Sequence, residues 1–283
     1  MEEKRKEAMI GLFEQKLKED EKSEATIRKY VSDVKCFMNY AKEDSAFTKE
    51  LVISYKQYLS AHYKTASVNS MLAAVNSFLC ATGHPDCAVK ALKMQRAAFR
   101  RESQELSREE YLRLLETAKK KGKRRLFLLM RTIAATGIRI SELPFITVEA
   151  LKERRAQVSL KGKTRTVILQ KQLCEELACY AKDMGIRAGS IFITRTGKPL
   201  DRSNVLHQMK GLYEEAGVPK DKIYPHNFRH LFAVTYYNAE RDICHLADLL
   251  GHSNINTTRI YTQVSCEEQE QQLDRLGLLI EGI

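Results

Sequence analysis

The sequence predicts a mainly helical protein of two domains with one small β-hairpin. Three observations support this fold class. Apolar residues recur every three to four positions along most of the chain, as they do on one face of an α-helix. This spacing changes to an alternating one only between residues 156 and 169, as expected for strands. A basic stretch from Lys90 to Arg101 separates two helical parts, and a chain of 283 residues suits about two domains.

The composition indicates a folded protein with an anionic partner. Hydrophobic residues make up 43% of the chain, and the net charge is +11. This charge favours DNA, RNA or an anionic membrane surface as partner, with a solvated lysine-rich face as the alternative. No apolar run is long enough to span a membrane, and the charged N-terminus is no secretory signal. Seven cysteines without a Cys-x-x-Cys pair predict reduced thiols in the cytoplasm and no zinc site.

The N-terminal part predicts a bundle of four or five helices. Apolar residues at helical spacing indicate helices over residues 4–20, 24–41, 48–62 and 66–81. Ser23 is placed to cap the second of these, and Gly83 with Pro85 ends the fourth. Nothing in these helices indicates chemistry. Their lysines form either a solvated face or a face that contacts phosphates.

The chain divides into an N-terminal domain, a basic linker and a second domain, at residues 1–95, 96–105 and 106–283. In the linker, Arg96, Arg100 and Arg101 either lie across a DNA backbone or belong to a helical extension without a specific role. The second domain begins at Ser107, which suits a helix N-cap because Glu110 stands three residues later, as in a capping box.

Arg139 is the first candidate site residue. A helix predicted over residues 123–136 ends at Gly137, and Arg139 follows between two isoleucines. A guanidinium among apolar residues needs an anion, because an unpaired buried charge is costly. This anion is either a carboxylate such as Glu142 or the phosphate of a ligand.

Residues 156–169 predict a β-hairpin that turns at Gly162. The turn carries Lys161, Lys163 and Arg165, and a turn with so many cations is often a solvated tip. Two helices should follow the hairpin. The first covers residues 174–185, and the second, capped by Asp201 or Ser203, runs through Tyr213.

A further helix should start at Pro225, because proline is favoured in the first turn. His226 then lies at the positive end of the helix dipole and Arg229 lies one turn further on, so both can face one anion. His226 and His230 have the spacing of a metal-binding pair, but Asn227 stands where zinc proteases carry Glu. A structural hydrogen bond is therefore the favoured role of His230.

His252 and Tyr261 complete the set of candidates. An apolar helix ends at Gly251, His252 follows directly, and Tyr261 lies nine residues after His252. Cations and imidazoles can hold a phosphate, and a nearby tyrosine can attack it. The group therefore indicates phosphoryl transfer, in which catalysis is mostly positioning and electrostatic stabilisation.

These motifs resemble those of the tyrosine recombinases, the family of phage and transposon integrases and chromosome-dimer resolvases. The resemblance is carried by His-x-x-Arg-His, by Leu-Gly-His with a Tyr nine residues later, and by Thr-Gly-Ile-Arg-Ile-Ser-Glu-Leu around Arg139. The hairpin matches a turn that often reads Gly-Lys-Gly-x-Lys-x-Arg. Here Leu160 replaces the first Gly and the turn is one residue shorter. The family's hairpin lysine is therefore Lys161 or Lys163, and we favour Lys161.

The resemblance implies a helical, SAM-like core-binding domain and a mixed α/β catalytic domain. It further implies that Tyr261 attacks a DNA phosphodiester and forms a 3′-phosphotyrosyl bond, with no metal, ATP or other cofactor. In this mechanism Arg139 and Arg229 hold the nonbridging oxygens, which suits the bidentate geometry of guanidinium groups.

The remaining roles and the partners also follow from the resemblance. Lys161 protonates the leaving 5′-oxygen, His226 is the general acid or base, and His252 hydrogen-bonds the phosphate. The implied partners are double-stranded DNA with inverted-repeat core sites and a homotetramer formed on DNA by exchange of the C-terminal helix within residues 267–283. An accessory directionality factor is a further partner of some family members, and no membrane is involved.

Three functions fit the sequence. The favoured one is a site-specific recombinase that integrates or excises a mobile element. The second is a DNA-binding regulator of the same fold without strand exchange, and the third is a relaxing topoisomerase. The presence of every expected polar group argues against the regulator, whereas a topoisomerase uses similar residues and is distinguished by a test of strand joining between two DNAs. The sequence does not specify the DNA target, or integration over excision, inversion or dimer resolution.

Overall fold

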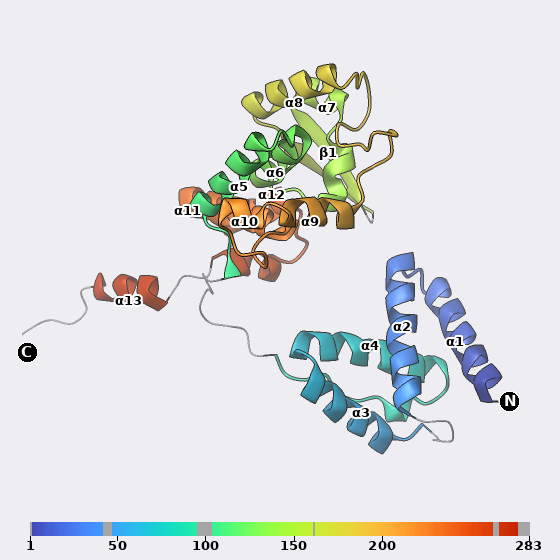
Figure 1. The fold of residues 1–283 in the computed structure, drawn as a ribbon. Helices are drawn as coiled ribbons and strands as arrows, with labels where there is room; N and C mark the ends of the chain where they lie inside the picture. The colour runs from blue at the N-terminus through green and yellow to red at the C-terminus, as the bar shows by residue number, and fades with distance from the viewer. Residues whose placement is uncertain (1, 42–46, 95–103, 161, 263–265, 277–283) are drawn as a thin grey trace, which may run out of the picture. The chain divides into compact units, whose positions relative to one another are not determined.

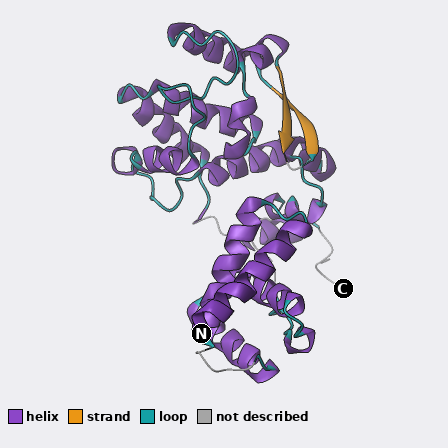
Figure 2. Cartoon of the chain, turned by 90° about the vertical axis from the view of Figure 1, so that its right-hand side faces the viewer, coloured by secondary structure: helices purple, strands orange, loops and turns teal. Residues whose placement is uncertain are grey.

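The computed structural model describes residues 2–41, 47–94, 104–160, 162–262 and 266–276. The chain forms two compact units, Met1–Arg96 and Ala97–Ile283 (Figure 1). Helices dominate both units, and one pair of strands lies in the second (Figure 2), so the predicted mainly helical class with a small hairpin is confirmed. The predicted domain limits stay a prediction, and the linker residues Arg96, Arg100 and Arg101 lie outside the described residues.

The described residues of the N-terminal unit form a bundle of four α-helices with one 3-10 helix: α1 (Glu2–Glu19), α2 (Glu24–Tyr40), α3 (Lys49–His62), α4 (Thr65–Ala81) and η1 (Pro85–Cys87). As predicted, Ser23 caps α2, and its hydroxyl accepts a hydrogen bond from the backbone N–H of Thr26. Phe13 packs edge-on against Phe78 at 5.5 Å between ring centroids, so aromatic contacts link α1 to α4 in the core.

The second unit contains α5 (Arg108–Lys120), α6 (Arg124–Thr136), η3 (Ile140–Phe145), α7 (Val148–Glu153), α8 (Lys171–Asp183), α9 (Arg202–Lys210), α10 (Tyr213–Ala216), α11 (Pro225–Glu240), α12 (Ile243–Leu250), η4 (Ile255–Thr257), η5 (Arg259–Tyr261) and α13 (Cys266–Asp274). The predicted helix ends are confirmed. Ser107 and Glu110 form a capping box, and Pro225 is the first residue of α11. Gly137 and Gly251 end α6 and α12 with φ of +63° and +64°.

Other parts of the second unit differ from the prediction. The sequence did not predict η3 or α7, because six residues are too few to show a helical period. The helix expected over 174–185 begins one turn earlier. The helix expected to run through Tyr213 is wrong, since α9 ends at Lys210 and α10 is a separate turn. Asp201 caps α9 by accepting from the backbone N–H of Asn204.

The two strands form the predicted antiparallel hairpin, β1 (Arg155–Leu160) and β2 (Lys163–Ile168). Gly162 occupies the turn with φ of +73°, a conformation that glycine adopts readily. Val158 and Val167 are buried, and α7 contacts both β1 and α8. The hairpin is thereby fixed to the helical part of the unit, with Arg165 paired opposite Val158.

Helix α11 is the element around which the second unit is arranged. It contacts α6, α12 and η5, and Phe228 near its start is fully buried in the main core. A smaller apolar cluster lies where α11, α12 and η5 meet, and its buried members are Ala233, Val234, Leu246, Leu250 and Tyr261. One face of α11 therefore supports the core and another supports the tyrosine.

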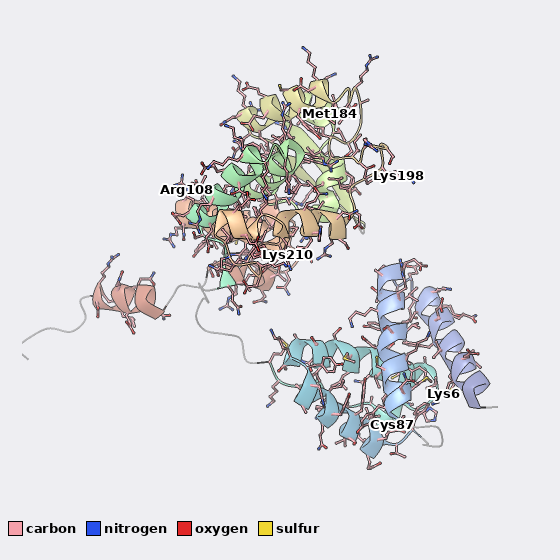
Figure 3. All side chains as sticks on the ribbon, in the orientation of Figure 1. Lys6, Cys87, Arg108, Met184, Lys198 and Lys210 are labelled. Carbon is pink, nitrogen blue, oxygen red and sulfur yellow. The ribbon has the colours of Figure 1, made fainter. Side chains whose placement is uncertain are left out.

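The surface of both units carries many charged side chains, such as Lys198 on the second unit (Figure 3). No helix among the described residues is long and apolar enough to cross a membrane. The six cysteines whose side chains the structure describes are free thiols.

Gly137 should be the glycine of this unit least tolerant of substitution. A Cβ at Gly137 would lie 2.4 Å from Cδ1 of Phe232 and 3.0 Å from Cδ2 of Leu250, at a positive φ that side chains rarely adopt. We expect Gly137→Ala to lower the free energy of unfolding by about 2–4 kcal/mol, through strain and overpacking. Urea unfolding monitored by circular dichroism measures this loss.

Gly185→Ala is the matched control, because Gly185 has φ of +68° but open space around it. We expect a loss of about 1 kcal/mol there, from backbone strain alone. Equal losses for the two variants would show that Phe232 moves aside without cost.

Candidate active site

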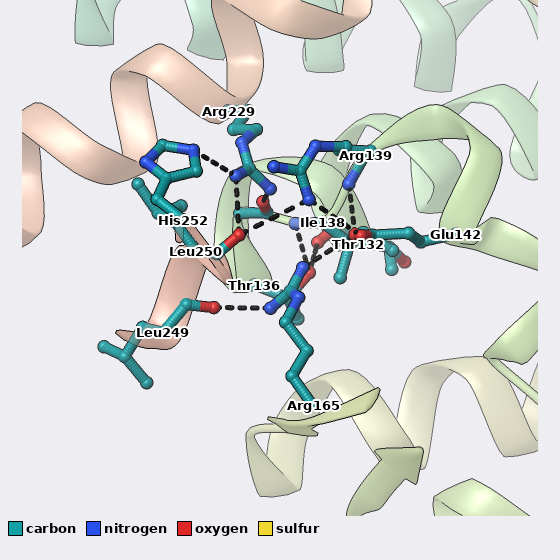
Figure 4. Close-up of polar contacts among 11 residues, drawn as sticks. Thr132, Thr136, Ile138, Arg139, Glu142, Arg165, Arg229, Leu249, Leu250 and His252 are labelled. Atoms are coloured by element: carbon teal, nitrogen blue, oxygen red, sulfur yellow. Dashed lines mark hydrogen bonds and ion pairs between the residues drawn. The ribbon is translucent and has the colours of Figure 1, made fainter. Parts of the chain in front are cut away.

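Three helix ends and one strand bring the reactive side chains together in the second unit. Arg139 follows the end of α6, Arg229 lies in the first turns of α11, and His252 follows the end of α12. Strand β2 adds Arg165 to the same group (Figure 4). Helix ends carry backbone carbonyl and N–H groups without intrahelical partners. Such a place can therefore hold guanidinium groups and also an anion.

Arg229 is the most deeply buried of these cations, with 2% of its surface exposed. Its guanidinium donates to the carbonyl oxygens of Gly137 at 2.5 Å and Leu250 at 2.8 Å, and to Nε2 of His252 at 2.9 Å. Burial, followed by the charge of Arg139, lowers the pKa of Arg229 to about 10. The group therefore stays charged at neutral pH, and its buried N–H groups have partners.

Arg139 is paired with Glu142, one of the two kinds of anion that the sequence left open. Its backbone N–H donates to Oε2 of Glu142 at 2.7 Å, and its Nη1 donates to Oε1 at 3.0 Å. Burial acts to raise the pKa of Glu142, but the N–H of Arg139 and the guanidinium of Arg165 outweigh it, and this pKa is lowered. The Arg139 side chain is 42% exposed, so it can still contact a ligand.

His252 lies between Arg229 and Thr258. Arginine only donates hydrogen bonds, so Nε2 of His252 accepts from Arg229, and Nδ1 carries the proton that is donated to Oγ1 of Thr258 at 2.9 Å. Burial, followed by the charges of Arg229, Arg139 and Arg165, lowers the pKa of His252 to about 4. His252 is therefore neutral in the free protein at physiological pH.

This neutral state makes stability depend on pH. The pKa of His252 is below the ordinary value of 6.5, so between pH 6.5 and about 4 the unfolded chain binds a proton that the folded protein does not. The stabilisation is present above pH 6.5 and is lost as the pH falls toward 4. We expect wild type to lose about 1–2 kcal/mol more than His252→Gln between pH 7.5 and 5.

Urea unfolding of both proteins at the two pH values measures this difference. The comparison cancels the titration of other groups, His226 included, because both proteins contain them. Parallel losses in the two proteins would show that His252 has an ordinary pKa in the folded state.

His226 is the second residue of α11 and lines a pocket of about 450 Å³. The pocket is lined by Ile138, Arg139, Ile140, Ser141, Pro144, Leu200, Arg202, Leu206, Tyr224, Pro225, His226 and Arg229. Desolvation, followed by the charges of Arg229, Arg139 and Arg202, lowers the pKa of His226. A neutral imidazole that faces a pocket with three arginines can accept a proton from a group beside a bound anion.

Tyr261 lies in η5 and is 3% exposed. Its ring stacks on His252 with 6.3 Å between centroids and 16° between planes, and it meets the ring of His230 edge-on at 5.0 Å. Nε2 of His230 lies 3.5 Å from a carboxylate oxygen of Glu105, which fits the structural role expected for His230. His252 therefore contacts both Tyr261 and the buried Arg229.

The structure brings five of the six predicted site residues to this region: Arg139, His226, Arg229, His252 and Tyr261. The sixth, Lys161, lies outside the described residues. Of the alternative, Lys163, the backbone is described as the start of β2. The choice between the two lysines therefore stays a prediction.

Sequence reasoning assigned no specific role to Arg165, Thr258 or Arg202, which the structure places at the site. Arg165 donates to the carbonyl oxygen of Leu249, 84 positions away along the chain, and no sequence spacing connects such partners. The available signal was weak: Arg165 stands opposite Val158, a buried position of the hairpin, where a charge needs a partner. His226 and His230 belong to no group of three potential metal ligands among the described side chains.

Comparisons with protein families agree with this geometry. Residues 104–268 match the phage integrase family, and residues 10–81 match the phage integrase N-terminal SAM-like domain. The first match covers more than half of the chain and contains every predicted site residue. The predicted core-binding and catalytic domain types are therefore confirmed.

Individual proteins match over most of the chain. Tyrosine recombinase XerA of Thermococcus kodakarensis is 28% identical over 282 residues, which cover 96% of each chain. Tyrosine recombinase XerD of Bifidobacterium longum is 29% identical over 86% of this chain and 88% of its own.

Solved structures share the fold. A lambda integrase tetramer bound to a Holliday junction has a TM-score of 0.71 at 18% identity and covers 98% of this chain and 79% of its own. The Tn1549 transposon integrase bound to transposon right end DNA has a TM-score of 0.69 at 15% identity and covers 95% and 99%. With the family match, these findings show that the chain belongs to the phage integrase family of tyrosine recombinases, enzymes that exchange DNA strands.

Proposed function

We propose that this protein is a site-specific recombinase that integrates or excises a mobile element through a covalent bond between Tyr261 and DNA. The observation that carries the proposal is the pocket lined by Arg139, Arg229 and His226, with Tyr261 stacked on the neighbouring His252. Two guanidinium groups beside the N-terminus of α11 suit a phosphodiester, whose nonbridging oxygens they can hold. The buried tyrosine supplies a nucleophile beside that position.

The proposed reaction balances without an external energy source. The Tyr261 hydroxyl attacks phosphorus while His226 accepts its proton, which forms a 3′-phosphotyrosyl bond. The bond from phosphorus to the 5′-oxygen breaks, and the hairpin lysine, Lys161 in our assignment, protonates the leaving oxygen. A 5′-hydroxyl of the partner strand then reverses these steps on the new strand. One ester bond replaces another at each stage.

His252 changes its role when DNA binds. In the free protein its Nε2 accepts from Arg229, so it cannot donate to a phosphate. A bound phosphate is an opposite charge close to the imidazole, which favours the protonated form and raises the pKa of His252 above its value of about 4. Protonated Nε2 then donates to a nonbridging oxygen. DNA binding should therefore be accompanied by proton uptake.

The proposed partners are double-stranded DNA with inverted-repeat core sites and three further copies of this chain. The lambda integrase tetramer on a Holliday junction supports a homotetramer. Leu273 at the end of α13 is 58% exposed and Leu276 just after it is 59% exposed, which supports exchange of this segment between copies. A directionality factor would act on this complex, in the cytoplasm. The transposon integrase match supports a mobile element, and the XerA match is the reason to test dimer resolution.

The test begins with selection of bound fragments from a random duplex pool, because the sequence does not specify the target. Two selected duplexes of different length, one with a nick that traps the cleaved end, are then incubated with the protein. A recombinase gives a covalent protein–DNA band on a denaturing gel and a hybrid strand from the two duplexes. Tight binding without either product would indicate a regulator, and the covalent band without hybrid strands would indicate a topoisomerase.

A further inference from the structure

Arg165 is a partly buried member of the site to which the proposed reaction gives no role. It stands in the middle of β2, and its side chain is 13% exposed. It donates from Nη2 to Oε2 of Glu142 at 2.6 Å and from Nη1 to the carbonyl oxygen of Leu249 (Figure 4). A single guanidinium therefore joins the hairpin to two other parts of the site.

The first connection leads to Arg139. Oε2 of Glu142, which Arg165 contacts, also accepts from the backbone N–H of Arg139, and Oε1 accepts from the Arg139 side chain. The Glu142 side chain is 3% exposed, so this carboxylate has no solvent partner that could replace either arginine. Loss of Arg165 would leave the carboxylate with one cation, and its oxygens would then reorient toward Arg139.

The second connection leads to His252. A Cβ on Gly251 would lie 2.4 Å from Cδ and 2.9 Å from Nε of Arg165, so the Arg165 side chain occupies the place of the missing side chain. Nε is buried and has no hydrogen-bond partner among the described residues. The Arg165 side chain therefore lies close to Gly251, in the peptide that leads from α12 into His252.

The third connection is the hairpin itself. A two-stranded sheet is marginally stable alone, so its position depends on what fixes it to the rest of the unit. Arg165 lies three residues after the Gly162 turn and supplies a charged anchor near that end. A catalytic group carried by the turn would therefore be placed, relative to Arg139 and His252, through Arg165.

We propose that Arg165 is a positioning residue that sets the relative placement of the hairpin, Arg139 and His252 for strand cleavage. This inference rests on the proposed function and adds a residue that acts through Glu142 and Gly251 rather than on DNA. Misplacement of reacting groups by about 1 Å can reduce a rate about 100-fold. Binding of DNA depends on the summed contacts to phosphates and changes much less when one partly buried arginine is lost.

The experiment compares wild type, Arg165→Ala, Arg165→Lys and Arg155→Ala. Arg155 is the matched control, because it is an exposed arginine on the other strand of the same hairpin. Gel shifts give the DNA affinity, and the covalent band at saturating protein gives the cleavage rate. We expect Arg165→Ala to lower the rate about 100-fold and the affinity less than about threefold. Arg165→Lys should recover part of the rate, and Arg155→Ala should keep it.

Two double-variant comparisons test how Arg165 acts. If it acts through Glu142, then Glu142→Gln with Arg165→Ala should lower the rate by much less than the product of the single effects. Gly251→Ala should lower the cleavage rate less in the Arg165→Ala background than in wild type, because the added Cβ then has no Arg165 Cδ at 2.4 Å. Multiplicative effects in both comparisons would overturn the proposal, as would equal losses of rate and affinity in Arg165→Ala.

A measurement that does not depend on catalysis tests Arg165 separately from the proposed function. NMR titration of the His252 ring in the DNA-free protein should show a higher pKa in Arg165→Ala than in wild type, and no change in Arg155→Ala. An unchanged pKa of His252 in Arg165→Ala would overturn the proposal. If wild type forms no covalent band, the proposed function fails and the titration still tests whether the Arg165 guanidinium lies close to His252 in solution.

Discussion

Replacing Tyr261 with Phe should remove the covalent protein–DNA band, with a fall in cleavage of at least about a thousandfold. The substitution deletes only the hydroxyl, which is the attacking group in the proposed reaction. The ring still stacks on His252 and meets His230, so the fold is retained. Loss of a single hydroxyl in this setting changes stability by about 1 kcal/mol or less. Cleavage of the nicked duplex on a denaturing gel measures the effect.

Tyr237→Phe is the matched control. Tyr237 lies on α11 at the edge of the same apolar cluster, and its ring contacts the Arg241 guanidinium, a contact that Phe also makes. This variant should cleave like wild type. A covalent band that persists in Tyr261→Phe and disappears in Tyr237→Phe would show that Tyr237, and not Tyr261, is the nucleophile.

Arg229→Gln should lower the cleavage rate about a thousandfold, because the transition state loses a charged donor from a desolvated site. The variant should also be destabilised by about 2–4 kcal/mol. The carbonyl oxygens of Gly137 and Leu250 both accept from this guanidinium, and Gln cannot reach both. Cleavage is therefore measured at low temperature with excess protein, and urea unfolding gives the stability separately.

Arg113→Gln separates loss of structure from loss of catalysis. The Arg113 guanidinium also donates to two carbonyl oxygens at a helix end, those of Ala216 and Gly217, away from the site. We expect a smaller loss of stability and a normal cleavage rate. If both variants lost cleavage in proportion to stability, Arg229 would have a structural role only.

The sequence predicted those features of the fold that depend on neighbouring residues. Four helix boundaries follow from local signals: the capping box at Ser107, the glycine ends of α6 and α12, and the proline start of α11. The last three of these lie within two residues of Arg139, His252 and His226. The three-residue step from His226 to Arg229 likewise predicted a shared face, and both line one pocket. Site residues attached to such local signals could be found before the structure was known.

What the sequence could not predict depends on contacts between distant parts of the chain. It offered a carboxylate or a phosphate for Arg139, and the structure shows the carboxylate, with the guanidinium still partly exposed. It treated Arg165 as a turn cation, whereas folding carries this residue to Glu142 and Leu249. Short elements such as α7 were missed because one or two turns give no period.

The acceptors that gather the three arginines have a consequence for sequence change over evolutionary time. Arg165 donates to the carbonyl oxygen of Leu249, and Arg139 and Arg229 donate to that of Leu250. Every amino acid carries a backbone carbonyl, so no side-chain replacement at these two positions deletes an acceptor. The acceptors for the three arginines therefore depend on where α12 ends and not on its side chains, whereas burial in the apolar cluster still requires an apolar side chain at Leu250.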